Sequence, residues 1–86
     1  MLRFEKTCEA CPEQYDVFDG DENVGYVRLR WGWVSAEVPG AYEDKLVFSE
    51  QIDKEGFQGE FTDENQRKYY LALIEIAIRK WIKENE

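Results

Sequence analysis

The alternation of apolar and polar residues predicts short strands along the first half of the chain. The segment Leu2–Thr7 alternates, with Leu2 and Phe4 on one face, and Tyr15–Phe18 predicts a second strand. Gly, Asp and Asn are concentrated in the segment Asp19–Asn23, a composition typical of a turn. The chain is therefore expected to open with two strands and a tight turn.

The clearest strand prediction is Val24–Trp31, in which Val27, Leu29 and Trp31 are expected to share one face. Gly32 stands between two tryptophans, a position typical of a bulge or a tight reversal. The chain is then expected to return as a strand.

Three further segments complete the predicted sheet side of the fold. Trp33–Val38 predicts the returning strand, with Val34, Ala36 and Val38 aligned, and Pro39-Gly40 ends it. A shorter strand is expected over Lys45–Ser49, followed by a loop that Gly56 and Gly59 frame and that carries Phe57 and Phe61.

The C-terminal segment Glu64–Asn85 predicts one long helix. Asp63 is the expected N-cap, with Gln66 completing a capping box. Its polar stripe is narrow and consists of Lys68, Ala72, Glu75, Arg79 and Lys83. The apolar arc is thus wider than the roughly 100° that a one-sided surface helix needs. Either the sheet curls around the helix or part of the arc meets another copy of the chain, so a monomer and a homodimer both remain open.

Together the pattern predicts an α+β fold, an antiparallel meander of four to five strands with one C-terminal helix packed on it. Residues 1–86 are expected to form a single α+β domain, since 43% of the residues are apolar and 15% aromatic. No apolar run approaches the roughly 20 residues of a membrane span, and the first residues lack the apolar stretch of a signal peptide. We therefore expect a cytoplasmic protein that does not enter membranes.

Charge narrows the choice of partner. The net charge of −8 repels nucleic acid and anionic membranes and attracts a basic protein surface. Residues 9–23 contain six acidic residues and no basic one, and residues 41–64 contain eight acidic residues against two lysines. The candidate partner-binding residues are Asp19, Asp21, Glu22, Glu43, Asp44, Asp53 and Glu55.

Two interpretations of these carboxylates remain open. They either solvate the surface or project together as one recognition face that imitates the phosphates of nucleic acid. Aromatic residues near them would anchor such an interface or lie in the core; they are Tyr15, Phe18, Tyr42, Phe48, Phe57 and Phe61.

A C-x-x-C pair, Cys8 and Cys11, is the one candidate metal site. A redox centre needs neighbouring cations or a helix N-terminus, whereas the neighbours here are the carboxylates of Glu9, Glu13 and Asp16. A zinc ion would neutralise two thiolates that lie among carboxylates. Either these carboxylates or the cysteines of a second chain would complete the four ligands of the site. The alternative is a pair of reduced cysteines that support a turn.

Nothing in the sequence indicates catalysis. The chain has no histidine, the commonest general base at neutral pH, and no Gly-rich phosphate loop or nucleophile elbow. We therefore expect a binding protein and not an enzyme.

Two segments carry a resemblance to known proteins, Lys6–Val17 (KTCEACPEQYDV) and Gly25–Gly32 (GYVRLRWG). They resemble small proteins of phages and mobile elements of Gram-positive bacteria. In length, charge and lack of catalytic motifs, the whole chain is similar to the small acidic anti-CRISPR inhibitors. That resemblance implies binding to an RNA-guided CRISPR nuclease, whose positive channel suits an acidic inhibitor, and a block of DNA access. No functional residue is carried over from it.

Overall fold

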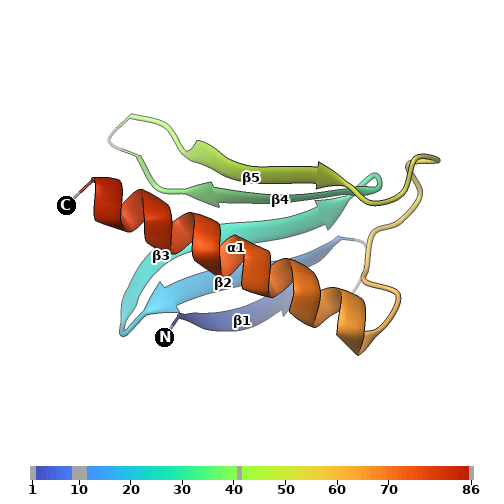
Figure 1. Cartoon of the computed structure of the whole chain (residues 1–86), viewed down its shortest axis with the longest axis horizontal. Helices are drawn as coiled ribbons and strands as arrows, with labels where there is room; N and C mark the ends of the chain where they lie inside the picture. Colours follow the sequence, from blue (N-terminus) through green and yellow to red (C-terminus); the bar gives the residue numbers. More distant parts are fainter. Residues whose placement is uncertain (1, 9–11, 41, 86) are drawn as a thin grey trace.

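The computed structural model describes residues 2–8, 12–40 and 42–85. It contains a five-stranded antiparallel sheet in the order β1-β2-β3-β4-β5, with helix α1 lying across one face (Figure 1). The predicted α+β meander is thus confirmed. The elements are β1 (Arg3–Cys8), β2 (Glu13–Asp19), β3 (Glu22–Arg30), β4 (Trp33–Val38), β5 (Lys45–Gln51) and α1 (Glu64–Glu84).

Strand register gathers the small and branched apolar residues on the face that the helix covers. Val27 stands between Tyr15 of β2 and Ala36 of β4, and Leu29 pairs with Val34. All five are buried, because side chains of directly paired residues share one face of a sheet. Two fully buried helix residues, Ile74 and Ile78, complete this core.

Helix α1 begins where it was predicted, but its capping differs. The Asp63 carboxylate accepts the backbone N–H of Gln66 at 2.8 Å, as an N-cap does. The Gln66 side chain does not return this bond to Asp63; its amide oxygen accepts the N–H of Thr62 at 2.8 Å instead. The capping box is therefore displaced by one residue.

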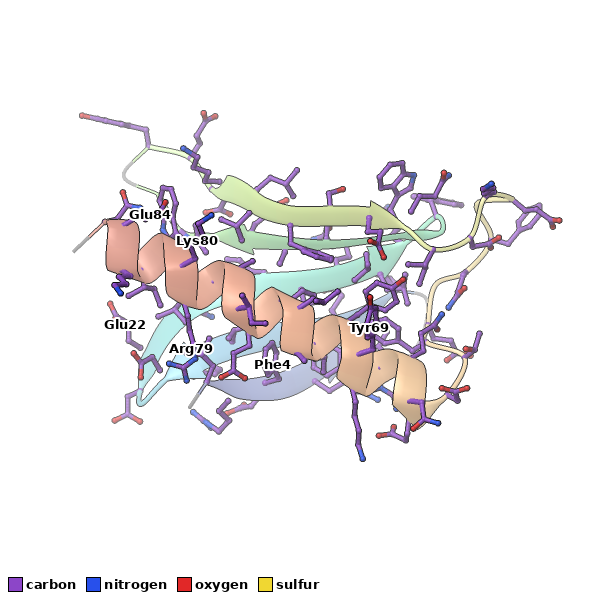
Figure 2. All side chains as sticks on the ribbon, in the orientation of Figure 1. Phe4, Glu22, Tyr69, Arg79, Lys80 and Glu84 are labelled. Atoms are coloured by element: carbon purple, nitrogen blue, oxygen red, sulfur yellow. The ribbon has the colours of Figure 1, made fainter. Side chains whose placement is uncertain are left out.

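The sheet covers only part of the helix's broad apolar arc. Ile74 and Ile78 are the fully buried residues of the helix, while Tyr69 and Ile76 are 59% and 65% exposed. Figure 2 shows Tyr69 on the helix, which lies in front of the sheet in that view. No helix within the described residues is long and apolar enough to cross a membrane.

Strands β1, β2, β3 and β5 differ from the predicted bounds by one or two residues, and two of these differences have an identifiable reason. Strand β2 begins two residues earlier than expected, at Glu13, because Arg67 of the helix neutralises the buried Glu13 side chain. Strand β3 ends at Arg30, and Trp31 does not share the buried face of Leu29. The reversal takes two residues, Trp31 and Gly32, so that the prediction for Trp31 was wrong.

The meander sorts the connections to two ends of the sheet (Figure 1). The β2–β3 turn and the β4–β5 loop lie at one end, where the helix also finishes. The β3–β4 turn and the segment from β5 to α1 lie at the other end. The nine residues of β3 separate the two ends by roughly 30 Å.

Candidate functional site

The predicted partner-binding carboxylates divide between the two ends. Five exposed ones lie at the end that we call the acidic end: Asp19, Asp21 and Glu22 at the β2–β3 turn, and Glu43 and Asp44 in the β4–β5 loop. Figure 2 shows Glu22 and Glu84 at this end, together with Lys80 of the helix. Within the described residues none of the five forms an ion pair.

Asp53 and Glu55 lie at the opposite end, because they follow β5 and not β4. The hypothesis that all seven carboxylates form one recognition face is therefore wrong. In a meander, successive connections alternate between the two ends of the sheet. Two acidic loops separated by one strand therefore lie at opposite ends.

The Asp53 carboxylate is also engaged in its own loop. It accepts the backbone N–H groups of Glu55 at 3.0 Å, Phe57 at 3.0 Å and Gln58 at 2.9 Å. These hydrogen bonds hold the pKa of Asp53 below its ordinary value, because they favour the charged carboxylate. Asp53 therefore shapes the loop that presents Phe57.

The turn between β3 and β4 consists of Trp31 and Gly32, both with positive φ, 55° and 77°. Positive φ at both central residues is what a two-residue type I′ hairpin requires, and Asn-Gly is the preferred pair there. For a residue with a bulky side chain this backbone region costs about 1–2 kcal/mol. Trp31 bears that cost with 68% of its side chain exposed, so the strain is not offset by burial.

The turn is fastened to the loop that follows β5. Gly32 donates its N–H to the Gln58 carbonyl at 2.9 Å, and its own carbonyl accepts the N–H of Ile52 at 2.8 Å and of Asp53 at 3.2 Å. A Cβ on Gly32 would lie 2.3 Å from the Asp53 carbonyl oxygen. The turn and the loop therefore form one interlocked unit.

This unit displays three large aromatic side chains, which we call the aromatic end: Trp31, Trp33 and Phe57. Their exposed fractions are 68%, 45% and 82%. Beside them lies a hollow of about 220 Å³, lined by Pro12, Arg30, Trp31, Phe57 and Gly59. Exposed aromatic side chains around a concavity are the usual anchors of a protein interface.

Sequence reasoning found Phe57 as a candidate anchor but missed the two tryptophans of the aromatic end. Of the other predicted anchors, Tyr15 and Phe61 are buried, and Tyr42 is fully exposed at the acidic end. The available signal was the pattern Trp-Gly-Trp, because a hairpin turn at Gly32 exposes at least one neighbouring ring.

Arg30, on the rim of the hollow, is one of two arginines within the described residues that form no ion pair. The chain has five arginines, and Arg3, Arg67 and Arg79 each pair with glutamate. Within the described residues Arg28 and Arg30 form no ion pair, in a chain with nineteen acidic side chains. The guanidinium of Arg30 lies 5.8 Å from the centre of the Trp31 ring instead.

Arg28 differs from Arg30 in its surroundings. It lines a second, polar hollow of about 180 Å³ on the face of the sheet that the helix leaves uncovered, together with Asp16, Glu37 and Asp44. Cross-strand register places Asp16 and Glu37 on either side of Tyr26. These carboxylates line the same hollow as Arg28, whereas no carboxylate lines the hollow beside Arg30.

Glu13 and Arg67 form a buried ion pair that sequence analysis did not foresee. Arg67 Nε lies 2.8 Å from a Glu13 oxygen, Tyr15 also donates to this carboxylate, and the Phe61 N–H donates at 3.1 Å. Burial raises the pKa of Glu13, but the hydrogen bonds outweigh it and hold the pKa below its ordinary value. This network joins the helix to strand β2 of the sheet.

The predicted metal site is described only in part. Cys8 ends β1, half-buried and opposite Gln14, whereas Cys11 and Glu9 lie outside the described residues. Glu13, a suggested third ligand, is engaged by Arg67 and Tyr15. The described ranges contain no group of three or more metal-ligating side chains. Zinc binding at the cysteine pair stays a prediction.

The chain matches no protein-family model, no curated protein and no solved structure.

Proposed function

We propose that this chain is a non-catalytic inhibitor that binds another protein through its aromatic end. The observation that carries the proposal is Trp31, a bulky residue with positive φ that remains 68% exposed. The backbone of Trp31 is strained, and its exposed ring adds nothing to the core. Strain of this kind persists where the surrounding structure enforces it, and it clusters at functional sites.

The acidic end gives the proposed partner its character. Its five exposed carboxylates attract a basic surface such as the nucleic-acid channel of an RNA-guided nuclease. Charges at a distance from the contact mainly raise the association rate, whereas buried aromatic anchors set the dissociation rate. The two ends therefore have separable kinetic roles, which fits the resemblance to anti-CRISPR inhibitors.

The experiment measures binding to a panel of purified RNA-guided nucleases by surface plasmon resonance, with inhibition of target-DNA cleavage as a second readout. Phe57→Ser removes a ring from the aromatic end, and Tyr42→Ser removes an exposed ring from the acidic end as its matched control. We expect Phe57→Ser to weaken binding at least about tenfold through faster dissociation. We expect Tyr42→Ser to have little effect.

The charge test uses Asp21→Lys/Glu22→Lys against Glu55→Lys/Glu60→Lys, which makes the same change of charge at the other end. We expect the first pair to slow association several-fold at low salt, where the Debye length reaches roughly 30 Å, and the second pair to do so less, because it leaves the carboxylates of the acidic end in place. If no nuclease of the panel binds, or if Phe57→Ser binds as tightly as the parent, the proposal is wrong.

A further inference from the structure

We infer that the hollow at the aromatic end takes an apolar side chain of a partner peptide and that Arg30 pairs with a carboxylate close to that side chain. The inference deepens the proposed function, on which it rests, by giving the chemistry of the segment that docks. Nothing in the chain's resemblance to inhibitors assigns this hollow a ligand.

The size and lining of the hollow indicate one apolar side chain. Trp31, Phe57, Pro12 and Gly59 provide a largely apolar wall around about 220 Å³. Small-molecule sites are usually larger, roughly 300–1,000 Å³. A proline or leucine side chain of a peptide fits a space of this kind, where aromatic rings contact it from more than one side.

Backbone hydrogen bonds fasten the segments that line the hollow. Asp53 holds Phe57 through the N–H of Phe57 at 3.0 Å, and the Gln58 carbonyl holds the turn through the N–H of Gly32 at 2.9 Å. A site that is ordered before binding loses less conformational entropy when the ligand arrives. The strain at Trp31 is part of this preorganisation.

Arg30 supplies the charge complementarity. It lies on the rim of the hollow, next to Trp31 in sequence and opposite Trp33 in register. Among the described residues no carboxylate pairs with it, although acidic side chains outnumber basic ones by nineteen to eleven. A guanidinium can bind a carboxylate with two parallel hydrogen bonds, and that of Arg30 lies 5.8 Å from the centre of the Trp31 ring.

A peptide fits these features better than single-stranded nucleic acid, which also stacks on aromatic rings. Nucleic acid brings one phosphate per nucleotide and needs several cations, whereas the hollow offers Arg30 alone. Asp16 and Glu37 lie on the same uncovered face and would repel the following phosphates. A peptide with a single carboxylate beside its apolar residue avoids this repulsion.

The test selects binders from a random decapeptide library displayed on phage, with the whole chain immobilised. Trp31→Asn and Arg30→Gln serve as comparison targets, since both residues are exposed and Asn suits the conformation of residue 31. Circular dichroism verifies that both variants are folded. Enriched peptides are then synthesised with a fluorescent label and titrated by anisotropy, beside a labelled twelve-nucleotide dT oligonucleotide.

We expect enriched peptides to share an apolar residue with Asp or Glu within two positions. We expect Trp31→Asn to weaken their binding at least about tenfold and Arg30→Gln about fivefold, with little further loss when the peptide carboxylate is also removed. No enrichment over the Trp31→Asn target, peptides without a carboxylate, or tighter binding of the oligonucleotide would each overturn the inference. None of these results depends on a nuclease, so the proposed function is tested separately.

Discussion

The carbonyl oxygen of Gly32 accepts the backbone N–H of Asp53 at 3.2 Å, across twenty-one residues of sequence. This contact joins the hairpin turn that exposes Trp31 to the loop that exposes Phe57. Two features that look unrelated in the sequence, a Trp-Gly-Trp turn and an acidic loop, are therefore one structural unit. Backbone hydrogen bonds thus hold the turn and the loop of the aromatic end together.

Gly32→Ala should damage this unit more than the same change elsewhere. The added Cβ would lie 2.3 Å from the Asp53 carbonyl oxygen, at a φ of 77° that alanine rarely adopts. We expect a loss of unfolding free energy of about 2–5 kcal/mol, the sum of steric and conformational costs. Urea denaturation measures it.

Gly20→Ala is the matched control, because Gly20 also has a positive φ, 64°, but no atom within 4 Å of the added Cβ. Only the conformational cost of about 1–2 kcal/mol applies there. Equal losses for the two variants would show that the contact between the turn and the loop contributes nothing.

Asp53→Ala should loosen the loop that carries Phe57. The change removes the acceptor of three backbone N–H groups, those of Glu55, Phe57 and Gln58. We expect the Phe57 and Gln58 amides to exchange with deuterium faster, while amides of β3 keep their protection. Glu55→Ala also removes one negative charge but no acceptor of these hydrogen bonds. It should leave the exchange rates of the Phe57 and Gln58 amides unchanged.

The same loop should respond to acid. Because its hydrogen bonds lower the pKa of Asp53, their stabilisation is complete above the ordinary carboxyl pKa of about 3.9 and is lost as the pH falls through the lowered value. Hydrogen exchange of the Phe57 amide, corrected for its intrinsic pH dependence, should therefore lose protection below about pH 4. Constant protection down to pH 2 would contradict the capping role.

Arg67→Ala should destabilise the fold strongly, because it leaves the Glu13 carboxylate buried without its cation. Removing one partner of such a pair costs about 3–5 kcal/mol. Arg79→Ala breaks a half-exposed pair with Glu75 and should cost less than about 1 kcal/mol. Urea denaturation of both variants at pH 7 compares them.

The pH dependence of this loss has a definite sign. In the parent, the pKa of Glu13 is lowered by the folded state, so its stabilisation is present above about pH 4.3 and is lost as the pH falls through the lowered value. Without Arg67 the buried carboxyl favours its neutral form. The difference in stability between parent and variant should therefore shrink towards pH 3, and a constant difference would contradict the assignment.

The sequence predicted the fold because strand alternation, turn composition and the helix cap all agreed. Strands such as Trp33–Val38 and the N-cap at Asp63 were placed correctly. Glu13 was missed as a strand residue, since a carboxylate in an apolar face makes sense only once Arg67, fifty-four residues later, is known to reach it. Local pattern carries no information about such a distant partner.

The candidate site was less predictable, for a topological reason. Charge counted along the chain grouped Asp53 with Glu43 and Asp44, but the intervening strand β5 carries it to the other end of the sheet. The exposure of Trp31 depends on the two-residue length of one turn, because one further strand residue would turn its ring towards the core. Sequence alternation does not fix that length.

The most direct test of the account is the unfolding free energy of Trp31→Asn, which requires no knowledge of the partner. If Trp31 serves docking and lowers the stability of the fold, asparagine should relieve the strain of its positive φ, 55°. The free energy of unfolding should then rise by about 0.5–1 kcal/mol. A decrease of 1 kcal/mol or more would show that the exposed ring stabilises the fold and would contradict the account.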